Sequence, residues 1–563
     1  MRNLFATTFL LVATHLIFQK CANISSPNGG PKDTIPPILI NSIPLNGTIN
    51  FANTELELEF SELINADKIQ QQLIITPKTD TKYKTTTKKN KLIITFEDLF
   101  QDSTTFNFNF ADAVTDITEN NPVVNLSLAF STGSYIDSLS ISGKIIDLFK
   151  QEEVDAYLVG LYPYTDTLNY FTQNPLYFTT SRDSSLFAIN YIKSGLYKLL
   201  VFNDENRNIL LDPETEAHGF VVDSILLDSS LSIEKPIPTL LQDVKPIAYI
   251  NARPTGPYIE IKYSKTISKY EISPNYLNHN LTGENKDLIR IYKSDKITVG
   301  DTISIISTVF DSLANSSIDT IKTTFVESNR KPSTFSSALE TSKSYLQDNQ
   351  LFNIKFNKPI SFTDTTRFFI SKDSSYRLQL TPKLTWNSNR TKLLIESNII
   401  TKDVIDTIQS LLTVDSTSSK NVDSNGPTSS KTKLLSVKFI TEAGAFISVE
   451  NDTSKLESLS LQLEEPTSYG SIKFSLNTSF QSFKLELLDN NNKPAYNHWN
   501  SKEITFSKVK PGKYKIRVLI DNNLDGSWSA GNLLQDIPPE EIYLHPDETS
   551  VRENWVLEIN ISF

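Results

Sequence analysis

The stretch LELEFSELI, residues 56–64, decides the fold. Its apolar residues Leu56, Leu58 and Phe60 alternate with two glutamates, so an extended strand here has one apolar face and one charged face. The same spacing returns in two further stretches, IEIKYSKTI (259–267) and FNIKFNKPI (352–360). In all three copies a small polar residue follows the third apolar one, and an isoleucine ends the segment. Three copies indicate an internal repeat built from strands.

A second signature closes these units. DITENNPVVNLSLAF (116–130) and DSLANSSIDTIKTTF (311–325) share an Asp, an Asn and a final Phe at identical spacing. The pattern predicts an Asp–Asn turn that leads into a last strand. The third unit reaches Phe439 only after a longer Ser/Asn/Gly loop. Each unit spans roughly 80 to 110 residues, the size of an Ig-like β-sandwich.

A different repeat fills the gaps between these units. SGLYKLLVFNDENRN (194–208) and PGKYKIRVLIDNNLD (511–525) align without a gap and share Gly, Tyr, Val and Asp positions. A strand, a Gly turn, a Tyr-bearing strand and an acidic loop predict a small antiparallel β-sandwich. The order along the chain is therefore Ig-like, second kind, Ig-like, Ig-like, second kind.

The composition excludes several classes of function. The net charge of −11 argues against a nucleic-acid partner, because phosphate binding needs a basic face. One cysteine allows no intrachain disulfide and no thiolate zinc site, and the five histidines are scattered. No G-x-S-x-G, P-loop, H-E-x-x-H or dinucleotide motif occurs. We therefore expect no enzyme and no required cofactor.

The N-terminus predicts export. Residues 1–20 combine a short positive start with about fifteen mostly apolar residues, which fits a signal peptide. Cys21, the single cysteine, follows directly and is our candidate for lipidation, with residues 21–36 as a flexible tether. The alternative is an ordinary cleaved signal with an incidental cysteine.

These features resemble a family of Bacteroidota-type lipoproteins with bacterial Ig-like domains. The resemblance rests on Cys21, on GGPKDTIPP (29–37), on the L-x-L-x-F-S-E strand and on the closing D…N…F-S-T-G. The second repeat resembles transthyretin-like or carboxypeptidase-regulatory-like sandwiches through its P-G-x-Y turn and D-x-N-x-D-G loop. The resemblance implies a lipid anchor in the outer membrane, on its periplasmic or cell-surface face. The residues before Cys21 depart from the usual lipobox.

We predict an all-β chain of tandem Ig-like and transthyretin-like antiparallel β-sandwiches. The expected segments are a signal peptide (1–20), a tether (21–36), Ig-like domain 1 (37–133), transthyretin-like module 1 (137–245), Ig-like domain 2 (246–328), Ig-like domain 3 (332–442) and transthyretin-like module 2 (456–563).

Two acidic loops are candidate cation sites. Alternate oxygen-bearing side chains converge on one cation in EF-hand loops, so such spacing predicts a structural Ca²⁺. The alternative is an Asx-rich turn that closes on its own backbone amides. The candidate ligands are Asp521, Asn523 and Asp525 in one loop and Asp204, Asn206, Asn208 and Asp212 in its sister.

We expect a non-catalytic envelope protein that acts as a spacer and binding platform. Its expected partners are the membrane, through the lipid, and proteins or glycans of the envelope. Trp499, Trp528, Trp555 and Tyr496 could stack on sugar rings, although they also suit the core or edge of the last sandwich. Two other interpretations stay open: an accessory subunit of an envelope enzyme or transport complex, and an enzyme with an unfamiliar site.

Overall fold

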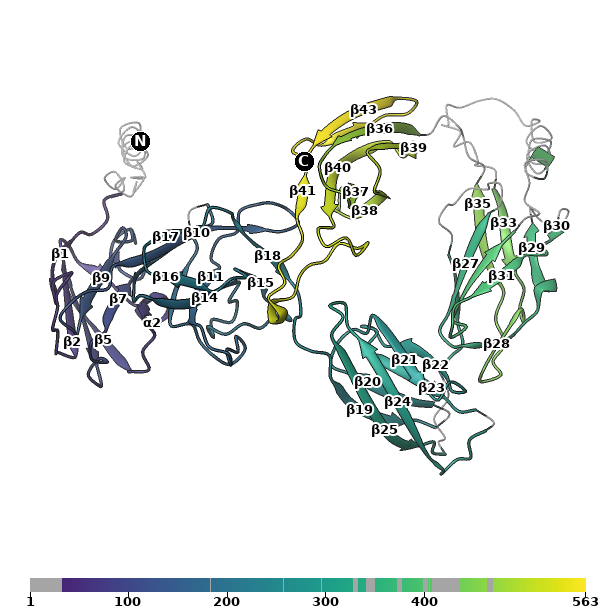
Figure 1. Ribbon diagram of the computed structural model, residues 1–563, viewed down its shortest axis with the longest axis horizontal. Coiled ribbons are helices and arrows are strands. Elements are labelled where there is room, and N and C mark those ends of the chain that lie inside the picture. Colours follow the sequence, from purple (N-terminus) through teal and green to yellow (C-terminus); the bar gives the residue numbers. More distant parts are fainter. Residues whose placement is uncertain are drawn as a thin grey trace, which may run out of the picture. The chain divides into compact units, whose positions relative to one another are not determined.

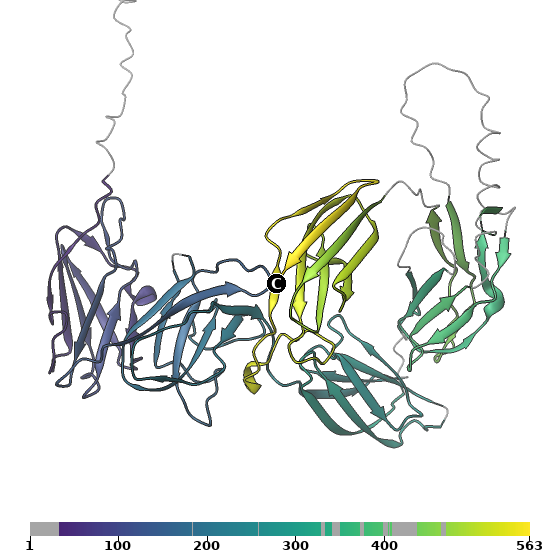
Figure 2. The ribbon, with the colours of Figure 1, turned by 45° about the horizontal axis from the view of Figure 1, so that its top comes forward.

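In the described part of the chain, the regular secondary structure consists almost entirely of β-strands (Figures 1 and 2). The computed structural model describes residues 33–563 except for the segments 183, 257, 295, 328–332, 341–349, 372–376, 398–403, 405, 408–435 and 463–468. The predicted signal peptide, Cys21 and most of the predicted tether lie outside the described residues, as does most of the long Ser/Asn/Gly loop of the third Ig-like unit. Among the described residues, no helix is both long and apolar enough to cross a membrane.

The chain divides into two compact units. The first comprises residues 1–147, 152–212 and 216–239, and the second comprises 148–151, 213–215 and 240–563. Five separate groups of sheets follow one another along the chain, and we call them the first to the fifth module. This confirms the all-β, tandem-sandwich prediction.

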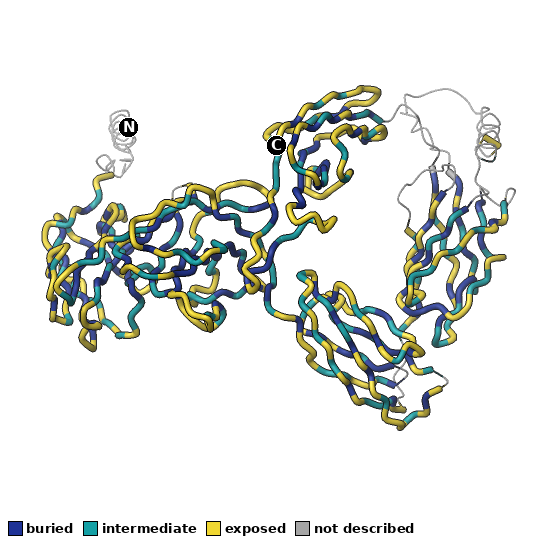
Figure 3. The backbone as a smooth tube through the Cα atoms, in the orientation of Figure 1, coloured by how far each residue is buried: buried dark blue, intermediate teal, exposed yellow. Residues whose placement is uncertain are grey.

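The first module packs a four-stranded sheet, β1-β2-β6-β5, against a three-stranded sheet, β4-β7-β9. Buried phenylalanines such as Phe60, Phe108 and Phe130 fill the space between them. Its elements are β1 (Leu39–Ile43), β2 (Glu55–Phe60), β3 (Ile64–Asn65), α2 (Ile69–Gln72), β4 (Ile74–Thr76), β5 (Tyr83–Lys88), β6 (Lys91–Phe96), β7 (Thr105–Asn109), β8 (Thr115–Asp116) and β9 (Ser127–Ser131). Buried and exposed positions alternate along the strands, as the sequence pattern predicts (Figure 3).

The small polar residue of each repeat accepts a hydrogen bond from a backbone amide of an earlier segment. Ser61 Oγ accepts a 3.0 Å hydrogen bond from the amide of Ile38, and the Ser61 amide donates at 2.9 Å to the Ile38 carbonyl. The other copies make the same side-chain contact: Ala248 N to Ser264 Oγ at 3.0 Å, and Ser336 N to Asn357 Oδ1 at 2.9 Å. A short acceptor therefore recurs where the first strand meets the second, and it pairs a backbone donor that water would otherwise have to satisfy.

The Asp–Asn turn is held by a buried carboxylate. Asp116 accepts hydrogen bonds from the amides of Glu119 at 2.6 Å and of Asn120 and Asn121 at 3.0 Å. Burial of Asp116 opposes its charge, but these backbone donors outweigh that effect and lower the pKa of its carboxyl. Asp311, its counterpart, accepts from the amides of Leu313 and Asn315, both at 2.9 Å.

The second module forms one curved sheet in the order β12-β11-β14-β15-β18-β10-β13, with β16 and β17 paired to β14 and β10. It is not wholly antiparallel, because β10 pairs in parallel with β17 and β18. Its strands are β10 (Leu139–Asp147), β11 (Leu158–Pro163), β12 (Tyr177–Thr180), β13 (Leu186–Ile192), β14 (Gly195–Phe202), β15 (Ala217–Phe220), β16 (Ile225–Leu227), β17 (Leu231–Ser232) and β18 (Ile237–Leu241).

The third and fourth modules are both sandwiches of separate sheets. The third comprises β19 (Tyr249–Pro254), β20 (Tyr258–Tyr263), β21 (Lys269–Ser273), β22 (Asn278–Thr282), β23 (Leu288–Tyr292), β24 (Thr302–Phe310) and β25 (Ser316–Thr324). The fourth comprises β26 (Ser337–Glu340), β27 (Leu351–Phe356), β28 (Ile360–Thr363), η1 (Thr365–Arg367), β29 (Phe368–Ser371), β30 (Arg377–Gln379), β31 (Lys383–Trp386), β32 (Lys392–Glu396), β33 (Ser436–Thr441), β34 (Phe446–Ser448) and β35 (Glu457–Gln462).

The boundary after the fourth module differs from the predicted one. We expected this domain to end at residue 442 and the last module to begin at 456. Instead, β35 pairs with β33 along its whole length, and β34 pairs with β28. Two further strands therefore belong to the fourth module, and the signature ending on Phe439 does not mark its last strand.

The fifth module shares the repeated sequence motif of the second but forms two sheets instead of one. Its two sheets run β39-β36-β43 and β38-β37-β40-β41, with β42 paired to β40, and β36 pairs in parallel with β43. Tyr514 donates from its hydroxyl to the Lys510 carbonyl at 2.9 Å, and Tyr197 donates to Lys193 at 2.8 Å. Burial raises the pKa of Tyr514 to about 12. The elements are β36 (Gly470–Asn477), β37 (Phe483–Leu488), β38 (Pro494–Trp499), β39 (Glu503–Val509), β40 (Gly512–Ile520), η2 (Leu533–Gln535), β41 (Ile542–Leu544), β42 (Thr549–Val551) and β43 (Val556–Ser562).

Candidate functional site

The two predicted acidic loops share one backbone arrangement. Asp204 accepts from the amides of Asn208 at 3.0 Å and Ile209 at 3.1 Å. Asp521, at the aligned position, accepts from Asp525 at 3.2 Å and Gly526 at 3.0 Å. Each loop therefore closes on its own amides, the geometry expected of an Asx-rich turn.

The remaining predicted ligands also lie within these loops. In the sister loop, the side-chain amides of Asn206 and Asn208 donate to Asp212 Oδ2 at 2.7 and 2.9 Å. In the other loop, the Asn523 side-chain amide donates to Asp525 Oδ2 at 3.0 Å. The structure thus brings the predicted residues of each loop together. Within the described residues, no group of three or more His, Cys, Asp or Glu side chains has the spacing to hold a metal ion.

Sequence reasoning missed one buried glutamate in each loop. Glu216 accepts from the amides of Glu205 at 3.2 Å and Asp212 at 2.9 Å. Glu540 accepts from the amides of Asn522 at 2.8 Å and Ser529 at 2.8 Å. Because they lie at different distances from the aligned Asp residues, no common spacing in the sequence marks them.

A second candidate site is a cleft inside the first compact unit, between the first and second modules. The amide of Lys78 donates a 2.8 Å hydrogen bond to the carbonyl of Leu176, which ties the two modules together beside β4 and β12. Strands β4 and β7 of the first module contact β12 and β13 of the second. The cleft between these strands has a volume of about 310 Å³, which falls in the range of ligand sites.

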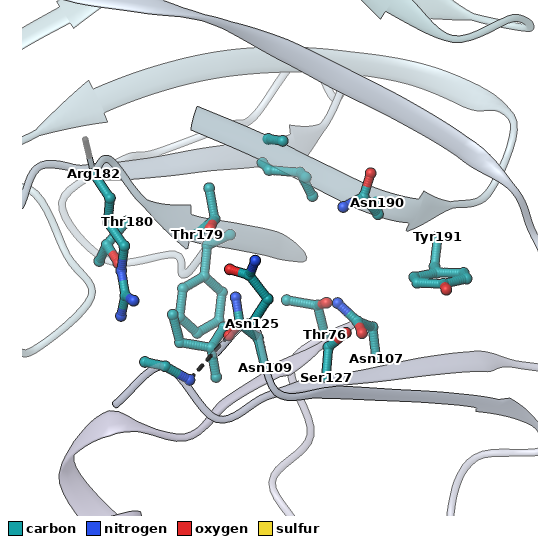
Figure 4. A pocket seen from close by; sticks show the side chains of 15 residues that line it. Thr76, Asn107, Asn109, Asn125, Ser127, Thr179, Thr180, Arg182, Asn190 and Tyr191 are labelled. Carbon is teal, nitrogen blue, oxygen red and sulfur yellow. Dashed lines mark hydrogen bonds between the residues drawn. The ribbon is translucent and has the colours of Figure 1, made fainter. Parts of the chain in front are cut away.

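Strand register explains which side chains reach the cleft. In the sheet β4-β7-β9, Thr76 lies opposite Asn107, and Asn109 lies opposite Ser127. Residues two apart on a strand share one face, so this face presents amides and hydroxyls while the phenylalanines point into the core. The full lining consists of Ile74, Thr76, Asn107, Asn109, Ala111, Asn125, Ser127, Phe178, Thr179, Thr180, Arg182, Ala188, Ile189, Asn190 and Tyr191 (Figure 4).

A bulge in β13 forms part of the opposite wall. Leu139 pairs with Ile192 and Ile141 with Ile189, so Asn190 and Tyr191 together lie opposite a single residue of β10. Tyr191 takes a left-handed backbone with φ of 61°, which is uncommon for an aromatic residue. Bulges redirect side chains, and this one places two consecutive residues on the cleft.

Sequence reasoning did not find this cleft, although one signal was present. FNFNF, residues 106–110, alternates Phe with Asn, whereas the outward residues of LELEFSELI are charged. An uncharged outward face on a strand of a soluble sandwich indicates a surface that is covered or used. The partner wall is invisible from sequence because it depends on how the second module docks.

The aromatic residues of the fifth module have different surroundings. Trp555 is 54% exposed, whereas Trp499, Trp528 and Tyr496 are partly buried. Trp528 donates from Nε1 to the Glu540 carbonyl at 3.2 Å, and Tyr496 belongs to the shell of the module's core. The core and edge interpretation therefore describes three of the four residues.

Comparison with known proteins identifies one domain. Residues 33–132 match the family model of the bacterial Ig-like domain, a match that covers strands β1–β9. The first module therefore resembles the bacterial Ig-like domain. No curated protein matches the sequence.

Solved structures give only distant similarities. The major pilin subunit BcpA of Bacillus cereus is 10% identical, with 76% of this chain and 99% of the pilin covered and a TM-score of 0.12. A streptococcal ancillary pilin is 9% identical over 45% of this chain and 81% of its own, with a TM-score of 0.15. Cadherin domains 1–4 of protocadherin gamma B7 are 9% identical over 70% and 93%, with a TM-score of 0.13.

Proposed function

We propose that this protein is a non-catalytic, lipid-anchored envelope protein that acts as a spacer and binding platform. The observation that carries the proposal is the junction of the first two modules. A direct backbone hydrogen bond from Lys78 to Leu176 joins them, and a cleft lined by polar side chains lies beside this bond. A fixed joint suits a spacer, and a cleft with unused polar groups suits a platform.

The anchor part of the proposal rests on the sequence. Cys21 follows a signal-like segment, and a thioether-linked lipid with an additional acyl chain provides enough buried methylene groups for stable anchoring. Anchoring at this position would place the first module next to an outer membrane, with the other four modules following along the chain.

Membrane fractionation tests the anchor. We expect the wild-type protein in the detergent phase after phase partition, and the Cys21→Ala variant in the aqueous phase. A wild-type protein that keeps a free thiol and stays in the aqueous phase would contradict the proposal. Recovery of a stoichiometric enzyme or transport complex with the membrane-bound protein would instead favour the accessory-subunit role.

We also retain structural Ca²⁺ at the acidic loops as part of the proposal. The oxygen atoms of Asp204, Asn206, Asn208 and Asp212 suit a hard cation, as do those of Asp521, Asn523 and Asp525. In the structure these carboxylates accept hydrogen bonds from amide groups, and a bound Ca²⁺ would compete with those amides. The millimolar affinity of extracellular calcium modules would suffice for this role.

A further inference from the structure

We infer that the cleft between the first and second modules binds a neutral carbohydrate chain. The inference rests on the proposed role as a binding platform and names the class of ligand. Its basis is the polarity of the lining, the unused hydrogen-bonding groups and the bulge that presents an aromatic side chain.

The lining is polar and almost free of charge. Among the described residues of the lining Arg182 is the single charged one, and its guanidinium lies 3.4 Å from the carboxylate of Asp112. In contrast, 21% of all residues in the chain are charged. An acidic ligand would have to compete with Asp112 for Arg182, and a basic ligand would find no carboxylate among the described lining residues. The chemistry therefore favours an uncharged ligand.

The amides in the cleft have hydrogen-bonding capacity to spare. Asn107 Oδ1 is buried and has no hydrogen-bond partner within the described part of the chain. An unpaired buried polar atom is costly, and such atoms in native proteins call for an explanation. Asn109 is different, because its Oδ1 already accepts from the amide of Ala111 at 3.0 Å. The Asn107 side chain as a whole is only partly buried, so a turn of its carboxamide would let a ligand hydroxyl supply the donor that the protein does not.

The hydrogen-bonding groups that line the cleft are of the kind that pairs with sugar hydroxyls. A carboxamide offers two donors and one acceptor oxygen, and a threonine or serine hydroxyl both donates and accepts. Sugar hydroxyls have the same dual character. Asn107, Asn109 and Asn125 lie between Arg182 and Tyr191 in the view of Figure 4, with Thr76 and Ser127 beside them. The cleft therefore presents a row of groups that can pair with neighbouring hydroxyls.

The bulge in β13 adds an aromatic surface. Tyr191 is only partly buried, and its backbone lies in the left-handed region. Such strain gathers at functional sites. A Tyr ring has an apolar face and a polar tip, so it can pack against the C–H face of a sugar ring while its hydroxyl stays in water.

The central strand of the first wall can contact a ligand only through side chains. Peptides that add to a sheet pair with an exposed edge and use its free backbone groups, whereas the backbone groups of β7 are paired with both neighbours. Strands β4, β12 and β13 also line the cleft and lie at the ends of their sheets, so a peptide is the competing ligand that the test must distinguish.

The test is binding of the purified full-length chain to an array that holds neutral and acidic oligosaccharides together with extended peptides. We expect binding to neutral oligosaccharides, and titration calorimetry with the best of them gives the affinity. Asn107→Ala and Asn190→Ala should each weaken that affinity by about tenfold, the equivalent of one lost hydrogen bond. Tyr191→Ala should weaken it further.

Two matched variants control for nonspecific effects. Tyr164 is an exposed tyrosine of the second module, which also contains Tyr191, and Asn497 is an exposed asparagine of the fifth module. Neither residue lines the cleft. Tyr164→Ala and Asn497→Ala should bind like the wild type. Asn190 is exposed, so its variant should keep the wild-type melting temperature even if Tyr191→Ala does not fold.

The inference is wrong if no neutral oligosaccharide binds, if only acidic oligosaccharides or peptides bind, or if the cleft variants bind as tightly as the controls. These results are separate from the membrane test. A Cys21-anchored protein that binds no sugar would contradict this inference and leave the proposed function standing. An unanchored protein that binds a sugar in this cleft would support this inference and contradict the proposed lipid anchor.

Discussion

The amide of Lys78 and the carbonyl of Leu176 are 2.8 Å apart, and their hydrogen bond joins two modules that are separate repeats in the sequence. Lys78 follows β4 and Leu176 precedes β12, so the bond lies at the point where these strands meet. Because both partners are backbone groups, the identity of neither side chain is needed for the contact.

Removing the donor should loosen this junction. Lys78→Pro lacks the N–H, so we expect a broader distribution of distances between the two modules. Pulsed electron paramagnetic resonance can measure it with spin labels at Lys84→Cys and Tyr164→Cys in a Cys21→Ser background. Lys78→Ala keeps the N–H but removes the side chain, whose Nζ contacts Asn174 of the second module, and as the control it should retain the narrow distribution. Equal widths for both variants would show that the bond does not hold the junction.

The sequence predicted the repeated strands because their cause is local. Alternation along a strand is a property of the chain itself, so Leu56, Leu58 and Phe60 are buried as expected. The repeated Ser61 was recognised as a pattern, but its partner Ile38 was not, since the pairing depends on how β1 lies against β2. The final strands of the fourth module were missed because we expected the closing signature at Phe439 to end the module, whereas β34 and β35 follow it.

The candidate sites also differ in whether their residues are close in the sequence or are brought together only by the fold. The acidic loops were found because their residues are close together in the sequence, and the structure keeps Asp204 and Asn208 in contact. The cleft needs two modules to dock and a bulge to form in β13. Neither Asn107 nor Tyr191 has a sequence neighbour that reveals the other, so no motif search could have joined them.

Asp116 should make the first module sensitive to acid. The pKa of its carboxyl is lowered in the folded protein, so the charged form is favoured by folding. Its stabilising contribution is fully present above the unfolded pKa of about 3.9 and is lost as the pH falls through the lower folded value. We expect amide exchange around residues 114–123, corrected for intrinsic rates, to rise as the pH drops below about 4.

The Asp116→Asn variant tests the cause of this dependence. Its amide group supplies only one acceptor oxygen, so the turn should exchange faster at neutral pH and respond less to acid. An acid response that the variant retains in full would assign the effect to another group.

A buried ion pair should dominate the stability of the fourth module. Lys358 is fully buried, and its Nζ lies 2.5 Å from Glu450 and 2.7 Å from Asp452. Removing one partner leaves uncompensated buried charge, so Lys358→Ala should lower the free energy of unfolding by about 3–5 kcal/mol. Hydrogen exchange of peptides from β27 and β33 at increasing urea concentration measures the change in the full chain.

Lys355 provides a control three residues away. It pairs with Glu340 at 2.7 Å, but both side chains are about half exposed, so Lys355→Ala should cost less than about 1 kcal/mol. Similar losses for both variants would show that burial of the Lys358 pair is not what stabilises the module.

If the acidic loop of the fifth module binds Ca²⁺, chelation should lower the thermal stability of that module. Excess EDTA should lower the melting temperature of the transition assigned to the fifth module, and about millimolar Ca²⁺ should restore it. Asp521 also holds loop amides and the hydroxyl of Ser482, so Asp521→Ala should be less stable even without calcium. The decisive quantity is therefore the EDTA-dependent shift, which should vanish in Asp521→Ala with Asp525→Ala and persist in the exposed control Asp547→Ala. An unchanged melting temperature of the wild type in EDTA would mean that the loops are closed by their own amides.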